Sequence, residues 1–100
     1  MPSYRLSKRA VADVLEIAAF TADRFGPHQA QRYHAGLELT FQALAKDPGR
    51  GRNAAEIGPN MRRYNYESHV VFYHPNPDGV LIVRVLHQAM DAARHQMNND

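Results

Sequence analysis

Residues 68–87 constrain the fold of this chain more than any other stretch. They contain two apolar runs, at 70–73 and 80–86, which are rich in Val, Leu, Ile and aromatic side chains. Between the runs stand Pro75, Asn76, Pro77, Asp78 and Gly79. Turn-forming residues between two such runs are typical of a β-hairpin. Because proline cannot donate to a strand ladder, we expect the first strand to end before Pro75.

Arg84 is the only charged residue in the second run. A run that is apolar on both faces is typical of a central strand with cover on both sides. A buried charge without a partner costs several kcal/mol. We therefore expect Arg84 to face open surface, a carboxylate or a binding partner.

Two helices are predicted before the hairpin, at residues 8–25 and 27–46. Their apolar positions recur at intervals of three and four, which is the spacing of one helical face. In the first helix this face comprises Val11, Val14, Leu15, Ala18, Ala22 and Phe25, and in the second Ala30, Tyr33, Leu37, Phe41 and Leu44. Only Gly26 separates the two patterns, so the helices must form an antiparallel hairpin.

The other segments complete an α+β domain. Residues 4–6 and 61–66 are expected to be strands, and residues 49–60, with three glycines and a proline, a loop. The order β-α-α-β-β-β predicts a helical hairpin packed on one face of a small antiparallel β-sheet, as a single domain over residues 1–100. No element remains to cover the opposite face, so we expect that face to be bare and to bind a partner.

Composition excludes several classes of protein. The absence of cysteine rules out disulfides and thiolate metal sites. No apolar run approaches the ~20 residues of a membrane span, and the first residues do not resemble a signal peptide, so we expect a cytoplasmic protein that does not bind membranes. The formal net charge of +2 does not by itself select a nucleic-acid partner.

Catalytic and metal-binding motifs are absent from the sequence. The six histidines form no HExxH array, so no metal site and no cofactor is predicted. There is no cysteine nucleophile, and the glycines near Arg50 lack the Lys-Ser/Thr pair of a phosphate loop. General acid–base cleavage of RNA stays open, because suitable residue types occur at His87, Arg84, Arg62, Tyr64 and Arg94.

A basic segment follows the second helix. Arg50 and Arg52 lie in the glycine-rich loop, and Arg62 and Arg63 begin the next strand. Such residues are either solvated surface or a contact for an acidic protein segment or a phosphate backbone.

Several motifs resemble the ParE toxins of the ParE/RelE superfamily of type II toxin–antitoxin systems. They are YRLSKRA at 4–10, RFG at 24–26, QAQRY at 29–33, PGRGR at 48–52, HVVFY at 69–73 and VRVLHQ at 83–88. The likeness covers essentially the whole chain. It implies a bacterial toxin that inhibits DNA gyrase without being an enzyme. It also implies a ParD-like antitoxin, which forms a hetero-oligomer with the toxin by wrapping its C-terminal segment around it.

The same superfamily contains RelE-like, ribosome-dependent mRNA endonucleases, which are the alternative. Those relatives tend to carry an arginine early in the third strand, another just past the last strand, and a tyrosine or histidine further on. By position this chain has Val70, Gln88 and Arg94 instead. The resemblance therefore favours a gyrase-inhibiting toxin over a ribonuclease that uses His87 and Arg94.

Two sets of contact residues are expected from charges and apolar groups that the core does not need. The target-binding set is Arg84, His87, Met90, Arg94 and His95. The antitoxin-binding set is Ile17, Phe20, Arg50, Arg52 and Arg62. No catalytic residue and no sequence-specific binding of nucleic acid is expected.

Overall fold

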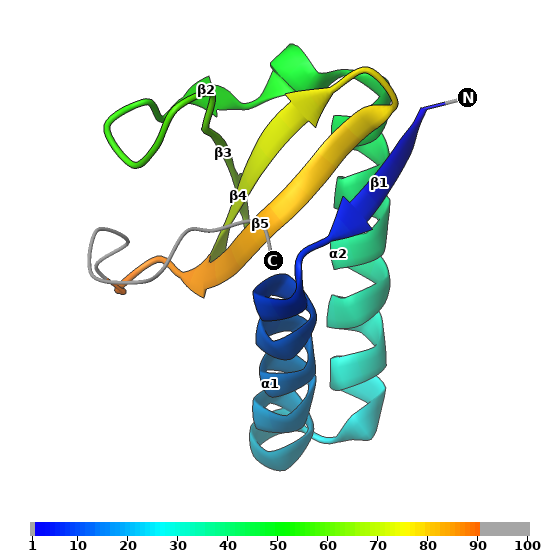
Figure 1. Cartoon of the computed structure of the whole chain (residues 1–100). Coiled ribbons are helices and arrows are strands. Elements are labelled where there is room, and N and C mark those ends of the chain that lie inside the picture. The colour runs from blue at the N-terminus through cyan, green and yellow to red at the C-terminus, as the bar shows by residue number, and fades with distance from the viewer. Residues whose placement is uncertain (1, 91–100) are drawn as a thin grey trace.

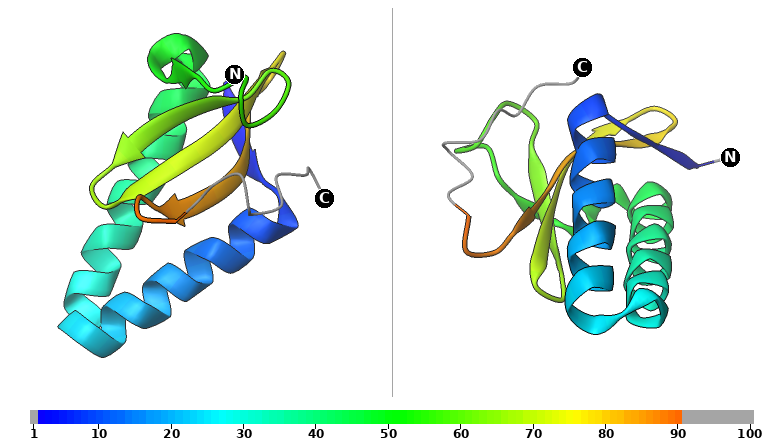
Figure 2. Two further views of the ribbon diagram at one scale, coloured as in Figure 1. Left: turned by 90° about the vertical axis from the view of Figure 1, so that its left-hand side faces the viewer. Right: turned by 90° about the horizontal axis from the view of Figure 1, so that it is seen from below.

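The computed structural model describes residues 2–90, in which two helices pack beside a five-stranded sheet (Figure 1). The helices are α1 (Lys8–Phe25) and α2 (Pro27–Lys46), and both agree with the predicted ranges. The strands are β1 (Ser3–Leu6), β2 (Arg52–Asn53), β3 (Arg62–Tyr66), β4 (His69–Asn76) and β5 (Gly79–His87). A 3-10 turn, η1 (Pro48–Arg50), follows α2. The helices lie side by side against one face of the sheet (Figure 2).

Local chemistry sets the ends of the helices. The hydroxyl of Ser7 accepts the backbone N–H of Ala10 at 3.0 Å, which caps the start of α1. Gly26 ends α1 with a φ of 92°, a conformation that favours glycine. Pro27 then begins α2, where its missing N–H is not needed. One residue is therefore enough to reverse the chain between the helices.

The sheet is mixed and not antiparallel as predicted. Its strand order is β1-β5-β4-β3-β2, and β1 runs parallel to β5 while the other neighbours are antiparallel. Parallel neighbours need a long connection, which the intervening helices and strands supply here. No turn motif ties β1 to β5, so the sequence pattern carried no signal of their relative direction.

β4 also continues past the point where we expected it to end. Pro75 pairs with Val80, and the turn is confined to residues 77–78. β3 accompanies β4 only as far as Tyr73. Pro75 thus lies where β4 has a single neighbour, which is an edge position that tolerates proline.

The main core lies between the helices and the sheet. α2 buries Ala30, Leu37, Phe41 and Leu44, as predicted, and the sheet contributes Val71, Tyr73, Val80, Ile82 and Val85. The predicted face of α1 is only partly right, because Val11, Leu15 and Phe25 are exposed while Ile17 is buried. The helix is turned so that the face with Ala10, Asp13, Val14 and Ile17 meets the sheet. Asp13 binds β5 in this orientation, as described below.

The opposite face of the sheet is covered, so the prediction of a bare face is wrong. A second cluster of buried residues comprises Ala54, Met61, Val70, Phe72, Val83 and Leu86, with Ile57 and Leu81 packed against it. The loop between β2 and β3 supplies Ala54, Ile57 and Met61, and a hydrogen bond from Ala54 N to Met61 O (2.9 Å) closes it. The loop has no periodic pattern, yet its three apolar side chains suffice to cover the strands beneath it.

None of the helices within residues 2–90 is long and apolar enough to span a bilayer.

Candidate functional site

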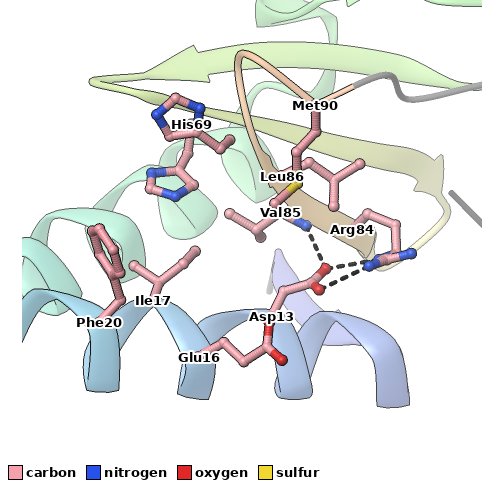
Figure 3. Close-up of a pocket in the computed structure, with 10 residues that line it drawn as sticks. Asp13, Glu16, Ile17, Phe20, His69, Arg84, Val85, Leu86 and Met90 are labelled. Atoms are coloured by element: carbon pink, nitrogen blue, oxygen red, sulfur yellow. Dashed lines mark hydrogen bonds and ion pairs between the residues drawn. The ribbon is translucent and has the colours of Figure 1, made fainter. Parts of the chain in front are cut away.

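A cavity of about 460 Å³ lies between α1 and the end of β5 (Figure 3). We call it the α1–β5 pocket. Its lining comes from α1 (Asp13, Glu16, Ile17, Phe20), β4 (His69), β5 (Arg84, Val85, Leu86, His87) and Met90 just beyond. Residues far apart in the sequence thus meet at one place.

An ion pair forms the base of the α1–β5 pocket. Arg84 Nε donates to Asp13 Oδ2 at 2.8 Å, and Arg84 Nη2 donates to Asp13 Oδ1 at 2.9 Å. Both residues are buried, with exposed fractions of 8% for Asp13 and 9% for Arg84. The hydrogen bonds with Asp13 are the main reason that the pKa of Arg84 is raised. Of the three environments expected for Arg84, the structure has the carboxylate.

Asp13 also completes the open edge of β5. β1 pairs with β5 only as far as Ile82. Beyond that point Ser7 Oγ donates to Val83 O at 2.8 Å, and Val85 N donates to Asp13 Oδ2 at 3.0 Å. The start of α1 therefore takes the place of a neighbouring strand, and buried backbone groups of β5 are satisfied.

A register shift in β5 accompanies this contact. The pairing passes from Phe72 with Arg84 to Tyr73 with Ile82, so Val83 is an extra residue. Such a bulge bends a strand and redirects its side chains. The guanidinium of Arg84 reaches round the edge of the sheet to α1 at this bulge (Figure 3).

Two histidines line the pocket opposite the ion pair, and Tyr33 contacts one of them. Tyr33 Oη lies 2.6 Å from His69 Nδ1, and the rings of His69 and His87 are 5.5 Å apart. Burial is the main reason that the pKa of His69 is lowered, and the neighbouring His87 lowers it further, while Asp13 opposes the shift. His69 is therefore neutral at pH 7. His87 Nδ1 accepts the backbone N–H of Ala89 at 3.1 Å.

The rim is apolar and accessible. Phe20 and Met90 are 58% and 49% exposed, although both are large apolar side chains. Glu16, also at the surface, adds a carboxylate beside them. Within residues 2–90 no three His, Cys, Asp or Glu side chains gather closely enough to hold a metal ion. The pocket is suited to receiving an apolar side chain of a partner.

The structure brings together two sets of predicted contacts that we had treated as separate. Ile17 and Phe20 were expected to bind the antitoxin, and Arg84, His87 and Met90 the target, yet all five line the α1–β5 pocket. Arg94 and His95 lie outside the described residues.

The three predicted basic contacts lie elsewhere. Arg50 and Arg52 are exposed near the β2 edge of the sheet. Arg62 is used inside the fold, since its Nη2 donates to the carbonyl oxygens of Gly49 (3.2 Å) and Gly51. Arg62 therefore holds the turn between α2 and β2.

Sequence reasoning missed Asp13, Glu16 and His69 as members of the site. A signal for Asp13 was present, because it lies among Ala10, Val14 and Ile17 on one helical face. A lone acid on that face and a lone base in the apolar strand β5 are the natural partners for each other. His69 carried no comparable signal.

Comparisons with known proteins identify relatives over nearly the whole chain. A sequence model described as the ParE toxin of the type II toxin–antitoxin system parDE matches residues 4–92. Toxin ParE1 of Caulobacter vibrioides is 41% identical over 95% of this chain and 98% of that protein. Toxin ParE1 of Mycobacterium tuberculosis is 40% identical over 92% of this chain and 95% of that protein. Toxin ParE of Escherichia coli is 35% identical over 91% and 89%, respectively.

A solved structure shares the fold. It is titled as the chromosomal ParDE toxin–antitoxin system from P. aeruginosa, and it matches with a TM-score of 0.74 over 87% of this chain and 96% of that chain. The sequence identity is 18%, so this match concerns the arrangement of the helices and strands.

Proposed function

The chain belongs to the ParE toxin family of type II toxin–antitoxin systems, and from that premise we propose that it inhibits DNA gyrase and is neutralised by a ParD-like antitoxin. It acts by binding in the bacterial cytoplasm. The observation that carries the proposal is the α1–β5 pocket, which combines an accessible apolar rim with a buried ion pair at its base.

The antitoxin occupies this pocket with an apolar side chain from its C-terminal segment. Phe20 and Met90 are large apolar side chains that the chain itself leaves exposed to water. Their burial under a partner is favourable and therefore contributes to binding. The binding mode is that of a helix or extended segment laid into an apolar groove.

Residues expected to contact the target line the same pocket. His87 and Met90 lie at its exposed end, and Arg84 at its base. An antitoxin segment that fills the pocket therefore covers the surface that gyrase would contact. Neutralisation by occlusion follows from this overlap.

The ribonuclease alternative has weaker support. The relatives that match nearly the full chain are ParE toxins. Arg84 is engaged by Asp13, so its charge is already balanced within the chain. RNA cleavage needs a base, an acid and a cation around one phosphate. Because Arg84 is bound to Asp13, it is poorly suited to supply that cation.

Substitution at the pocket rim tests the proposal. Replacing Phe20 and Met90 together by Ala removes two exposed side chains and leaves the buried core intact. Anchor residues at interfaces typically cost about 2 kcal/mol or more on truncation, so we expect antitoxin affinity to fall at least ~30-fold. Titration calorimetry with the purified antitoxin measures this.

The matched control is Leu15→Ala. Leu15 is 65% exposed on the same helix but does not line the pocket. Equal effects of the rim variant and the control would contradict the assignment of the pocket. Gyrase supercoiling assays and translation extracts then separate the two functions: inhibited supercoiling supports the proposal, and cleaved mRNA supports the ribonuclease.

A further inference from the structure

A row of side chains crosses the sheet on the face away from the helices. The register pairs Arg52 with Arg63, Arg63 with Phe72, and Phe72 with Arg84. Directly paired residues of neighbouring strands point to the same face. Arg63 confirms this placement, because its guanidinium carbon lies 5.3 Å from the centre of the Phe72 ring.

Two of the three arginines in this row form no ion pair with an acidic side chain of residues 2–90. Arg84 is bound to Asp13. In the described part of the chain neither Arg52 nor Arg63 forms an ion pair, and the buried Nε of Arg63 has no hydrogen-bond partner. Like charges directly opposite one another on neighbouring strands destabilise a sheet. Within residues 2–90, therefore, no ion pair to a carboxylate relieves the repulsion between Arg52 and Arg63.

We propose that Arg52 and Arg63 together bind the carboxylate of an Asp or Glu side chain in the antitoxin. This inference rests on the proposed function and adds a second contact, apart from the α1–β5 pocket. Neighbouring strands lie about 4.8 Å apart, so two guanidinium groups in direct register can approach one carboxylate. Hydrogen bonds between arginine and carboxylate are among the strongest in proteins.

The geometry favours an acidic protein segment over a nucleic acid. A polynucleotide needs a series of cations along its backbone, whereas this row offers two that are not already paired. Stacking of bases needs exposed aromatic rings, and Phe72, the aromatic residue of the row, is only 1% exposed. The site suits a single carboxylate.

The assignment also separates Arg63 from Arg62. Arg62 was expected to contact the antitoxin, but its guanidinium holds the carbonyl groups of Gly49 and Gly51. Arg63 was not among the expected contacts. We include it in the carboxylate site because it lies directly opposite Arg52 on the neighbouring strand.

Binding by the double variant Arg52→Gln/Arg63→Gln tests the proposal. Arg32→Gln is the control, because Arg32 is exposed on α2 and loses the same kind of charge. Charge-assisted hydrogen bonds contribute ~1.5–3 kcal/mol each, so affinity for the purified antitoxin should fall at least ~10-fold in the double variant. The wild-type affinity should also fall with added salt more steeply than that of the double variant.

The outcomes are distinct. If the wild-type chain binds the antitoxin and the double variant matches it in affinity and salt dependence, the proposal is overturned while the proposed function stands. If the wild-type chain does not bind the antitoxin, the proposed function fails.

A short poly-glutamate peptide then tests the carboxylate site by itself. Peptide binding that needs both arginines supports the site, and peptide binding that is the same without them overturns it. Tighter binding of a single-stranded oligonucleotide than of the peptide, lost in the double variant, also overturns it. Thermal unfolding of each variant verifies that the fold is kept.

Discussion

Asp13 joins α1 to β5, although the sequence pattern gave it no role. Its carboxylate receives two hydrogen bonds from Arg84 and one from the backbone of Val85. It thereby neutralises a buried cation and satisfies the edge of β5 at once. The shape of the α1–β5 pocket depends on this residue, because it joins the two walls.

We expect Asp13→Asn to destabilise the protein by about 3–5 kcal/mol, because it removes the carboxylate that receives two hydrogen bonds from the buried guanidinium of Arg84. Urea unfolding measures the change. Asp23→Asn is the control, since Asp23 lies exposed on the same helix and should change stability little. Similar losses for both variants would show that the ion pair is not the cause.

Two histidines make stability depend on pH. The pKa of His69 is lowered chiefly by burial and that of His74 by burial alone. The unfolded chain therefore takes up protons first, near pH 6.5, and the folded state becomes less stable as the pH falls from there towards the lowered pKa values. Well above pH 6.5 these histidines are neutral in both states, so they no longer make stability depend on pH.

The free energy of unfolding of the wild type should consequently decrease between about pH 6.5 and 5, and His69→Gln should reduce this slope. Urea midpoints across that range measure it. His28→Gln serves as the control, because His28 is exposed at the start of α2. A slope that is the same in all three proteins would contradict the contribution of His69.

At the scale of the elements, two segments cover parts of the sheet that no further strand or helix covers. They are the loop between β2 and β3 and the start of α1. The loop packs Ala54, Ile57 and Met61 over the outer face of the sheet. The start of α1 completes the edge of β5 beyond Ile82. Both devices cover the sheet without an additional strand or helix.

Met61→Ala tests the importance of the loop. Met61 is 1% exposed, so its truncation leaves a cavity against Phe72 and its neighbours, with an expected cost of ~2–5 kcal/mol. Leu39→Ala, at an α2 position that is 66% exposed, should cost far less. Chemical unfolding of the two variants gives the comparison, and equal values would mean that the loop does not seal the outer face.

At the scale of the whole molecule, two sets of residues that we expected to bind different partners line the same pocket. The α1–β5 pocket unites Ile17 and Phe20 with His87 and Met90. If both proposed partners use this pocket, one of them excludes the other. The Arg52–Arg63 pair lies on β2 and β3, at the opposite edge of the sheet from β1.

The antitoxin and gyrase should thus compete. We expect the purified toxin–antitoxin complex to show no binding to immobilised gyrase, while the toxin alone binds and is displaced by added antitoxin. Surface plasmon resonance measures both. A stable ternary complex would contradict the shared pocket, whereas failure of the toxin alone to bind would contradict gyrase as the target.

Short-range patterns were enough to predict most elements. The bounds of both helices, the reversal at Gly26 and the strand order along the chain follow from periodicity, capping and turn chemistry. The buried face of α2 follows too, because its apolar stripe is interrupted by no charge. The candidate site was predicted only in part, since Ile17, Phe20, His87 and Met90 were named without any sign that they meet.

The sequence by itself determined where both helices and the longer strands form, because these depend on interactions between residues a few positions apart, although it missed β2 and the true end of β4. Only the tertiary structure decided which face of α1 is buried, that β1 runs parallel to β5, and that a loop covers the outer face. Each of these depends on long-range contacts, such as the Asp13–Arg84 pair, whose partners are 71 positions apart. A local sequence pattern carries no information about a partner at that distance. It therefore identified Arg84 as an unusual charge, and only the folded structure identified Asp13 as its partner.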